Sequence, residues 1–259
     1  MSRQSPSNVG VSKAEYGNWV AKRLVYVPAA VGAGFLVLSF WVPVLAILAV
    51  LSFVVSGYFA YARYLFAPSG GDVQGLVWSN LVGHIGWDGK GRALDIGCGS
   101  GAVTIRLAQA YPNATVTGID QWGRQWEYSK VQCERNAATE GVEGRVSFQQ
   151  GSASSLPFPD ESFDVVVSNL TFHEVKDAPD KRLLIREALR VLKKGGKFGS
   201  QDLFLLKRTY GEIGPLLELV KDWGATRVEF TTTRDTPGVP GALKLPFMIG
   251  AMSLIAGEK

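Results

Sequence analysis

The chain has 259 residues, 46% of them hydrophobic, and its 27 basic and 23 acidic residues give a net charge of +4. This length suits one α/β domain of ordinary size plus an additional segment. Residues 1–23 hold four of the basic residues and one acid, so the remainder is nearly neutral. Nucleic-acid enzymes usually carry a basic stripe on their folded part, and we therefore expect no nucleic-acid partner.

An uncharged segment follows residues 1–23. None of the 39 residues from Leu24 to Ala62 is Lys, Arg, His, Asp or Glu. Pro43 divides this segment into two stretches, each close to the roughly 20 helical residues that cross a hydrocarbon core of about 30 Å. The sequence therefore predicts a transmembrane helical hairpin with two spans over residues 24–66.

Basic residues lie outside both ends of the predicted hairpin. Lys22 and Arg23 precede the first span, and Arg63 follows the second. By the positive-inside rule, this predicts a multi-pass membrane protein with both termini and the folded domain in the cytoplasm. Four alternatives remain open at this stage: a hairpin that enters one leaflet, one long helix kinked at Pro43, a signal peptide, and a helix pair buried in a soluble protein.

Residues 67–90 are expected to form a linker that contributes to a substrate lid. From Gly91 onward, short apolar runs alternate with helical patterns, which is typical of a parallel sheet covered on both faces. We expect strands at residues 92–97, 115–120, 145–151, 163–170, 197–204, 225–232 and 248–257. We expect helices at residues 101–112, 122–140 and 180–192, the last capped by Gly195 and Gly196.

A glycine loop follows the first expected strand. Gly97, Gly99 and Gly101 differ in spacing from the G-x-G-x-x-G loop that faces a pyrophosphate, and Asp95 stands just before them. A carboxylate there repels phosphate and favours a cation. S-adenosylmethionine carries a sulfonium, an α-ammonium and no phosphate. Asp120, which ends the second strand, is placed to accept hydrogen bonds from the ribose hydroxyls.

Four stretches of residues 91–259 resemble the class I methyltransferases that depend on S-adenosylmethionine, in particular the branch that includes the quinone and sterol methyltransferases. These stretches are "LDIGCGSG", "GID", "LPFPDESFDVVVSN" and "EALRVLKKGG". The resemblance implies an α/β fold with a Rossmann-like seven-stranded sheet and helices on both faces. It also implies S-adenosylmethionine as the cofactor, and no metal is expected.

The resemblance assigns cofactor contacts to positions in four loops. Ser152 stands where many relatives have an acid that accepts from the adenine amino group, so Ser152 or the Ala153 amide must serve instead. Trp122 and Trp126 are alternatively core residues of one helix. The cofactor-binding residues are expected to be Asp95, Gly97, Cys98 and Gly99 for the methionine end, Asp120, Gln121 and Trp122 for ribose and adenine, Ser152 and Ala153 for adenine, and Asn169 and Leu170 for the ammonium group.

His173 is the candidate catalytic base, because it follows the fourth strand and has an ordinary pKa of about 6.5. Glu174 could orient it or accept a proton itself. The structural alternative is that His173 shapes the acceptor pocket or caps the following helix. His84 is expected to pack or line a pocket, and both cysteines, Cys98 and Cys133, are expected to be reduced.

These features together predict a membrane-anchored methyltransferase that acts on a hydrophobic small molecule or lipid. Apolar residues before the first strand and around the last two strands would form its acceptor lid. Two alternatives are a detoxifying methyltransferase for thiols or amines of small xenobiotics, and a noncatalytic membrane scaffold that binds S-adenosylmethionine.

Overall fold

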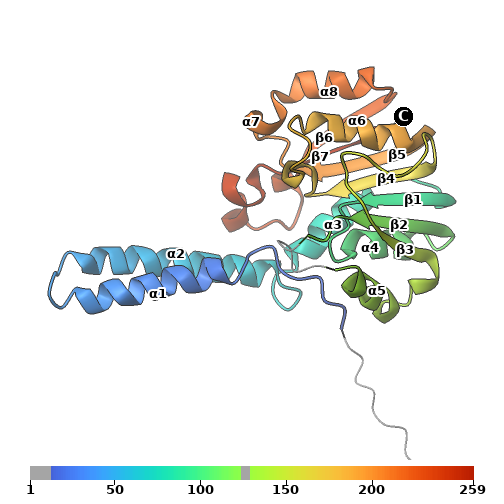
Figure 1. The fold of residues 1–259 in the computed structure, drawn as a ribbon. Helices are drawn as coiled ribbons and strands as arrows, with labels where there is room; N and C mark the ends of the chain where they lie inside the picture. Colours follow the sequence, from blue (N-terminus) through green and yellow to red (C-terminus); the bar gives the residue numbers. More distant parts are fainter. Residues whose placement is uncertain (1–12, 124–128) are drawn as a thin grey trace, which may run out of the picture.

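The computed structural model describes residues 13–123 and 129–259 (Figure 1). Its centre is a seven-stranded sheet in the order β3-β2-β1-β4-β5-β7-β6. All strand pairs are parallel except those of β7, which runs antiparallel to β5 and β6. The strands are β1 Gly91–Ile96, β2 Ala114–Asp120, β3 Val146–Gln150, β4 Phe163–Asn169, β5 Leu192–Asp202, β6 Arg227–Thr232 and β7 Ser253–Glu258.

Helices cover both faces of the sheet, as the sequence predicted. One apolar core lies between the sheet and helices α3, α4 and α5, and a second lies between the sheet and helices α6 and α8. The helices are α1 Arg23–Leu38, α2 Leu45–Phe66, α3 Val73–Gly83, α4 Ala102–Ala110, α5 Lys130–Thr139, α6 Arg182–Val191, α7 Lys207–Tyr210 and α8 Ile213–Asp222. Short helical turns η1 Glu143–Arg145, η2 Phe172–Glu174, η3 Thr233–Asp235, η4 Gly241–Leu243 and η5 Pro246–Gly250 complete the described part.

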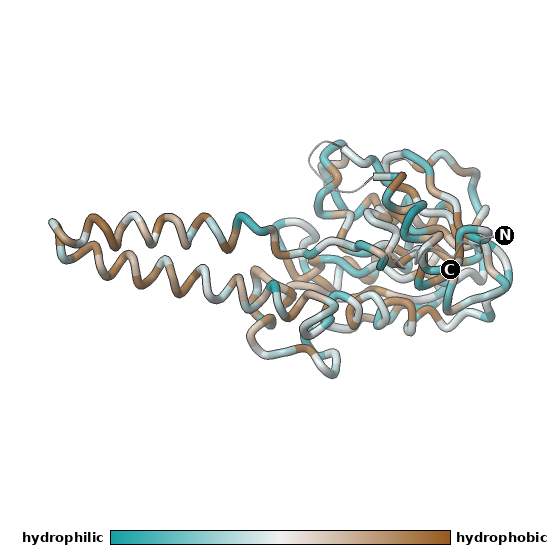
Figure 2. The backbone as a smooth tube through the Cα atoms, turned by 90° about the horizontal axis from the view of Figure 1, so that it is seen from below, coloured by the Kyte–Doolittle hydropathy of each residue, from teal (hydrophilic) through white to brown (hydrophobic). Residues whose placement is uncertain are grey.

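Helices α1 and α2 form an antiparallel hairpin that projects from the domain (Figure 2). The Ser56 hydroxyl donates to the Val25 carbonyl at 2.8 Å, and Gly32 lets the two helices approach closely at Phe53. The alternative of one long helix kinked at Pro43 is therefore wrong. Within the described residues, α2 alone is long and apolar enough to cross a membrane, and α1 is apolar but has only 16 residues. Only 11% of the apolar stretch of α2 is buried, so it is not a core helix.

Residues 13–22, which precede α1, lie against the domain, and we call them the strap. The Asn136 side chain donates to the carbonyls of Glu15 and Ser100, both at 2.9 Å. Trp19 packs edge to face on Trp78, with ring centroids 5.7 Å apart. Because Ser100 belongs to the glycine loop, the strap connects the base of the hairpin to that loop.

The segment expected as a linker, residues 67–90, contains α3. Val77 and Leu81 on this helix are fully buried. They belong to apolar clusters with the hairpin base and with the sheet, respectively. This segment is therefore part of the folded domain, and α3 couples the hairpin to the sheet.

Three expected boundaries are wrong, each for a local reason. The helix after β2 begins at Lys130 rather than at residue 122, with the Ser129 hydroxyl accepting from the Gln132 amide at 3.2 Å. Strand β5 already begins at Leu192, so the glycine pair at 195 and 196 lies within it and pairs with the backbone of Lys259 instead of capping a helix. Strand β7 begins at Ser253, because residues 246–250 form the turn η5.

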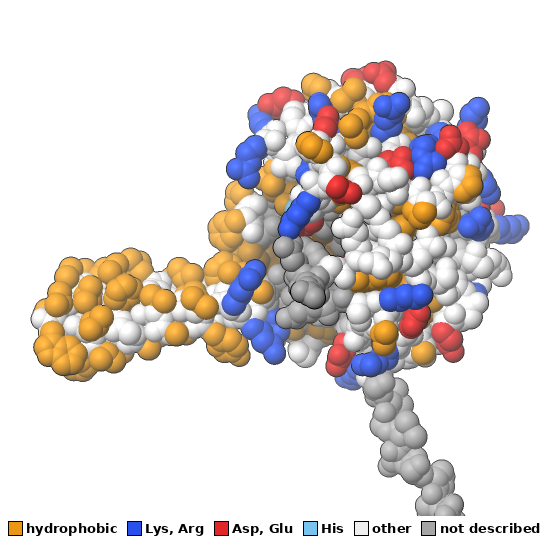
Figure 3. Space-filling view, in the orientation of Figure 1, with side chains coloured by type: hydrophobic (Ala, Val, Ile, Leu, Met, Phe, Trp, Pro, Cys, Tyr) orange, Lys and Arg blue, Asp and Glu red, His pale blue; other side chains and the backbone are white. Residues whose placement is uncertain are grey.

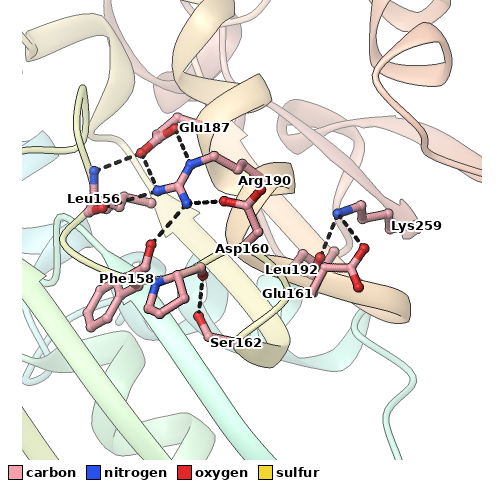
Figure 4. A network of polar contacts seen from close by, with 10 residues as sticks. Leu156, Phe158, Asp160, Glu161, Ser162, Glu187, Arg190, Leu192 and Lys259 are labelled. Atoms are coloured by element: carbon pink, nitrogen blue, oxygen red, sulfur yellow. Dashed lines mark hydrogen bonds and ion pairs between the residues drawn. The ribbon is translucent and has the colours of Figure 1, made fainter.

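A polar network fastens the loop after β3 to α6 (Figure 4). The Arg190 guanidinium donates to the carbonyls of Leu156 and Phe158 at 3.1 and 2.9 Å, and it pairs with Glu187 and Asp160. Glu187 in turn accepts from the Leu156 amide at 2.8 Å. Hydrogen bonds from Arg190 thus hold two carbonyls of a loop whose first residues stand at the carboxyl edge of the sheet. The motifs "LPFPDESFD" and "EALRVLKKGG" are therefore in direct contact.

Candidate active site

The glycine loop connects β1 to α4 at the carboxyl edge of the parallel strands. Gly97, Gly99 and Gly101 have φ values of 73°, 54° and 82°, a region that side chains disfavour. A Cβ on Gly97 would lie 2.0 Å from Thr171 Oγ1, in the loop after β4. The Gly97 amide donates to the Ile119 carbonyl at 2.7 Å. The loop is therefore held between the ends of β2 and β4, where ligands of such sheets bind.

Asp95 is the penultimate residue of β1, just before this loop, and is only 1% exposed. Thr104, in the first turn of α4, donates its hydroxyl to Asp95 at 2.7 Å. Burial raises the pKa of Asp95 to about 7 against the hydrogen bonds from Thr104, and the charge of Asp120 raises it further. The carboxylate thus accepts a hydrogen bond at the start of α4, in addition to its predicted role of attracting a cationic ligand. Its pKa near neutrality makes it sensitive to any nearby cation.

Asp120 connects the glycine loop to the residues after β2 through hydrogen bonds. Its two carboxylate oxygens accept from the Gly99 amide and the Trp122 amide, both at 2.9 Å. The Trp122 indole N–H donates to the Gly99 carbonyl at 2.9 Å. Each carboxylate oxygen keeps a second lone pair for a ribose hydroxyl.

Trp122 does not lie on a helix, contrary to the sequence prediction. Its φ is 41°, an uncommon value for an aromatic residue, and its two hydrogen bonds hold it there. Its ring also packs against the core on the α4 side. Gln121 is exposed, with its carbonyl accepting from the Gln150 side chain at 2.9 Å. Trp126 lies outside the described residues.

The loop after β3 forms hydrogen bonds with Asp177, an acid that the sequence pattern did not indicate. Asp177 accepts from the hydroxyls of Ser152 and Ser154 at 2.9 and 2.6 Å. The hydrogen bond from Ser154, together with that from Ser152, holds the pKa of Asp177 below its usual value. The neighbouring Ala153 is buried. A carboxylate therefore stands beside Ser152 although the residue itself is not an acid. Only the pairing of two distant loops reveals it.

The end of β4 carries two unusual features. Asn169 Oδ1 is buried, and no partner accompanies it within the described chain. Leu170 has a φ of 53°, and its amide donates to the Gln201 carbonyl at 2.7 Å. Together with Trp122, Leu170 is a strained non-glycine residue beside the glycine loop. Such strain concentrates at functional sites.

His173 lies two residues beyond the contact between Thr171 and Gly97. Its Nδ1 is 2.6 Å from Asp202 Oδ1, at the end of β5. Asp202 is 1% exposed and also accepts from the Phe172 amide at 2.8 Å. Burial lowers the pKa of His173, but the hydrogen bond and charge of Asp202 outweigh burial and raise the pKa above its ordinary value. Asp202 therefore fixes the ring and leaves Nε2 as the basic nitrogen.

Glu174 contacts His173, whereas His84 lies elsewhere, at the end of α3. Glu174 Oε1 is 3.4 Å from His173 Nε2 and is half exposed, so it can take up or release a proton at that nitrogen. His84 is exposed at the end of α3, with Nδ1 2.7 Å from the Asn80 carbonyl. The expectation that His84 packs or lines a pocket is wrong, because the helix end leaves it in solvent.

Both cysteines are free and buried, in agreement with the expected reduced state. Burial raises the pKa of Cys98 well above its ordinary value, so its thiol stays protonated inside the glycine loop. The Cys133 thiol donates to the Gly99 carbonyl at 3.1 Å. Across residues 13–123 and 129–259, no three His, Cys, Asp or Glu side chains are grouped to hold a metal ion.

Comparisons with known proteins show that this chain is similar to methyltransferases. Residues 94–199 match the model of a methyltransferase domain. The chain is 38% identical over 134 residues to the 27-O-demethylrifamycin SV methyltransferase of Amycolatopsis mediterranei, which covers 51% of this chain and 45% of that protein. It is 31% identical over 165 residues to an O-methyltransferase of Aspergillus nomiae, covering 57% of this chain and 70% of that protein.

The chain belongs to the methyltransferases that depend on S-adenosylmethionine. Among solved structures, a geranyl diphosphate methyltransferase in complex with this cofactor shares the fold, with a TM-score of 0.56 and 16% identity over 78% of this chain and 90% of that one. The methyltransferase described here spans less than half the length of the rifamycin relative, because the alignment covers 45% of that protein.

The residues of this methyltransferase fit the cofactor. The unpartnered Asn169 Oδ1 can accept from an ammonium group, and the carboxylates of Asp95 and Asp120 favour a positive charge. Asp177 lies beside Ser152, where its carboxylate could accept from an adenine amino group.

We expect cofactor affinity to depend on the protonation of Asp95. A bound cation favours the carboxylate, so binding releases a proton wherever the free protein still holds one, which is below about pH 7. The affinity for S-adenosylmethionine should therefore rise from about pH 5.5 to 7, by up to about tenfold per pH unit, and then level. Calorimetry in two buffers of different ionisation enthalpy counts the released proton.

The control for this experiment is Asp95→Asn, which should bind more weakly and lose the pH dependence. Asp164→Asn, which changes an acid at the opposite edge of the sheet, should keep the wild-type profile. A wild-type affinity that stays flat between about pH 5.5 and 7 would show that Asp95 serves only the start of α4.

We also expect the link between Asp202 and His173 to be visible in a titration. The chain has 2 histidines, so NMR resolves His173 once His84→Gln has assigned the other signal. Asp202→Asn should lower the pKa of His173, because the hydrogen bond and the charge that raise it are both lost. Glu174→Gln, at an exposed position, should lower it by less. An unchanged pKa in both variants would remove the positioning role of Asp202.

Proposed function

We propose that this methyltransferase is anchored to a membrane by the α1–α2 hairpin and methylates a hydrophobic small molecule or lipid. The observation that carries the proposal is the exposed apolar surface of the hairpin. Phe40 and Trp41 at its tip are 83% and 74% exposed, and Val50, in the half of α2 nearer the tip, is 61% exposed. Such a surface is costly in water and stable in a bilayer.

One apolar cluster joins the hairpin to the candidate active site. Ala62, Leu65 and Phe66 at the inner end of α2 pack in the same cluster as Leu243 and Ile249 of the turns η4 and η5. Leu170 and Leu203, which follow β4 and β5, pack against this cluster. These two residues are direct neighbours of Asn169 and Asp202 in the chain. Apolar packing is therefore continuous from the membrane side to the residues that would meet the acceptor.

The relatives support a small-molecule acceptor. The names of two of them refer to a demethylated rifamycin and to geranyl diphosphate. The near-neutral charge of the folded domain is consistent with an uncharged acceptor rather than nucleic acid.

The residues at the carboxyl edge would hold the cofactor in four places. Asp120 would accept from the ribose hydroxyls, and Asn169 would accept from the ammonium group. Ser152 and Asp177 would meet the adenine amino group, with Leu156 as an apolar neighbour. When bound, S-adenosylmethionine supplies a methyl group already activated by its sulfonium. The task of the protein is then alignment and the exclusion of water.

His173 would act where the acceptor carries its nucleophile as O–H or N–H. Asp202 holds Nδ1–H, so Nε2 takes the proton of the acceptor. The raised pKa of His173 makes it a stronger base but requires a pH above that pKa for the neutral form. The rate should therefore increase with pH through this pKa. Glu174, 3.4 Å from Nε2, can pass the proton to solvent.

The hairpin would place the domain and both termini in the cytoplasm. Lys22 and Arg23 are exposed at the start of α1, where they can meet anionic headgroups. The stretch of α2 from Leu45 to Tyr58, about 20 Å long, would lie in the bilayer, because the inner end of α2 packs in the domain. Helix α1, with 16 residues, would reach the far side together with the turn at residues 39–44.

The direct test is transfer of labelled methyl groups from S-adenosylmethionine into an extract of the host membrane, split into lipid and aqueous fractions. We expect label in the lipid fraction. His173→Gln should lower the rate by about a hundredfold or more, because a general base contributes about 10² to 10⁴, while affinity for S-adenosylhomocysteine stays within about twofold.

Three outcomes would contradict the proposal. Label confined to the aqueous fraction would favour a soluble xenobiotic as the acceptor. Cofactor binding without label in either fraction would favour a noncatalytic scaffold. An unchanged rate in His173→Gln would show that His173 does not act as the general base.

A further inference from the structure

The turns η4 and η5 lie directly against the hairpin. The Tyr58 hydroxyl on α2 donates to the Ala242 carbonyl at 2.9 Å. The Tyr58 ring also meets the Phe247 ring edge to face, with centroids 5.9 Å apart. In Figure 3, hydrophobic side chains extend from the hairpin onto the adjoining edge of the domain. We call residues 241–250 the lid segment.

The lid segment is apolar on both sides. Leu243 and Ile249 point inward, where they are 0% and 1% exposed in the cluster shared with α2. Leu245 and Phe247 point outward and are 40% and 66% exposed. An outward phenylalanine and leucine beside a buried apolar layer are unfavourable in water. An apolar phase on the outer side removes that cost.

The helix register fixes the height of Phe247 along the hairpin. The bond from Ser56 to the Val25 carbonyl puts these two residues level with each other. The helices are antiparallel, so the residue two positions nearer the hairpin base is Arg23 on α1 and Tyr58 on α2. These two residues are therefore also level with each other. Phe247 contacts Tyr58, so it lies at the height of the basic residues at the hairpin base. Phenylalanine and leucine side chains on membrane-surface segments enter the boundary between headgroups and acyl chains at this depth.

Charge at the same height fits a lipid surface. Lys22, Arg23 and Lys244 are all exposed, and Lys244 belongs to the lid segment itself. Long basic side chains can extend to headgroups while their apolar neighbours enter the boundary with the acyl chains. An aqueous protein partner would not explain why these charges lie level with the base of an apolar hairpin.

We propose that the lid segment is a second membrane contact, with Phe247 and Leu245 immersed in the interfacial layer, so that an acceptor enters from the bilayer beneath the lid. The inference rests on the proposed membrane anchor and deepens it. Leu243 and Ile249 on the inner side of the lid segment belong to the cluster that reaches Leu170 and Leu203. A lipid-soluble molecule that leaves the interface there meets apolar side chains on the way to the candidate active site.

The test attaches an environment-sensitive fluorophore to single introduced cysteines. Phe247→Cys reports on the lid segment, Val50→Cys on the hairpin, and Leu183→Cys, 49% exposed on α6, on the domain surface. The native thiols are buried and should not be labelled. The labelled full chain is placed in phosphatidylcholine and phosphatidylglycerol vesicles that carry a nitroxide either near the headgroup or deep in the acyl chain.

We expect the label at position 247 to be quenched at least threefold more strongly by the shallow nitroxide than the label at position 183. The label at position 50 should be quenched mainly by the deep nitroxide. If position 50 is quenched while position 247 behaves like position 183, the lid inference is wrong and the anchor stands. If neither position is quenched, the anchor itself fails, and the lid inference with it.

Initial rates in vesicles and in detergent test separately whether the acceptor enters from the bilayer, beyond the immersion of Phe247 itself. Phe247→Ser should lower the initial rate on membrane extract in vesicles at least fivefold and leave the rate on the same extract in detergent within twofold. Leu183→Ser, on the domain surface, should change neither rate. An equal loss in vesicles and in detergent would contradict entry from the bilayer and assign Phe247 to the folding of the lid.

Discussion

The close approach of Thr171 to Gly97 is the constraint on which the site depends. The loop after β4 can reach the glycine loop only because position 97 has no side chain, since a Cβ would lie 2.0 Å from the threonine hydroxyl. This contact sets where the chain leaves β4, and therefore where Asn169 and His173 stand. The Gly97 amide and the carboxylate of Asp120 hold the other side of the loop to β2. Three parallel strands thus place their ends within reach of one ligand.

The hairpin and the candidate active site are connected through packing rather than through a flexible tether. The strap touches the glycine loop, because the Ser100 hydroxyl donates to the Tyr16 carbonyl at 3.3 Å, and α3 packs between the hairpin base and the sheet. The lid segment is bonded to α2 at Tyr58. The proposed anchor would therefore do more than hold the enzyme at a membrane, because it would also fix which side of the domain faces the lipid.

Much of the fold could be predicted from the sequence because its signals are local. Alternating apolar runs gave the seven strands, and the glycine loop with Asp120 indicated the cofactor. What failed depended on contacts across the chain. Trp122 leaves the expected helix because its indole and amide bond to Gly99 and Asp120. The glycines at 195 and 196 pair with the chain end, which no local pattern indicates.

The site residues divide in the same way. Asp95 and Asp120 were recognisable from their spacing, but the burial and helix-start role of Asp95 were not. Asp202 and Asp177 were missed because each acts on a residue more than 20 positions away, His173 in one case and Ser152 in the other. The contact of Asp202 with His173 requires the sheet order, in which β5 lies beside β4. The contact of Asp177 with Ser152 joins the loops after β4 and β3, which are not neighbouring strands, and neither contact leaves a periodic signal in the sequence.

The central claim is that the loop at the end of β1 binds S-adenosylmethionine. Calorimetry on the full chain tests it most directly, with S-adenosylmethionine, its demethylated product and a nicotinamide dinucleotide as separate ligands. We expect the first two to bind and the third not to bind. Gly97→Ala should weaken both, because the methyl group displaces Thr171. Uptake of the dinucleotide without uptake of either adenosyl compound would contradict the claim.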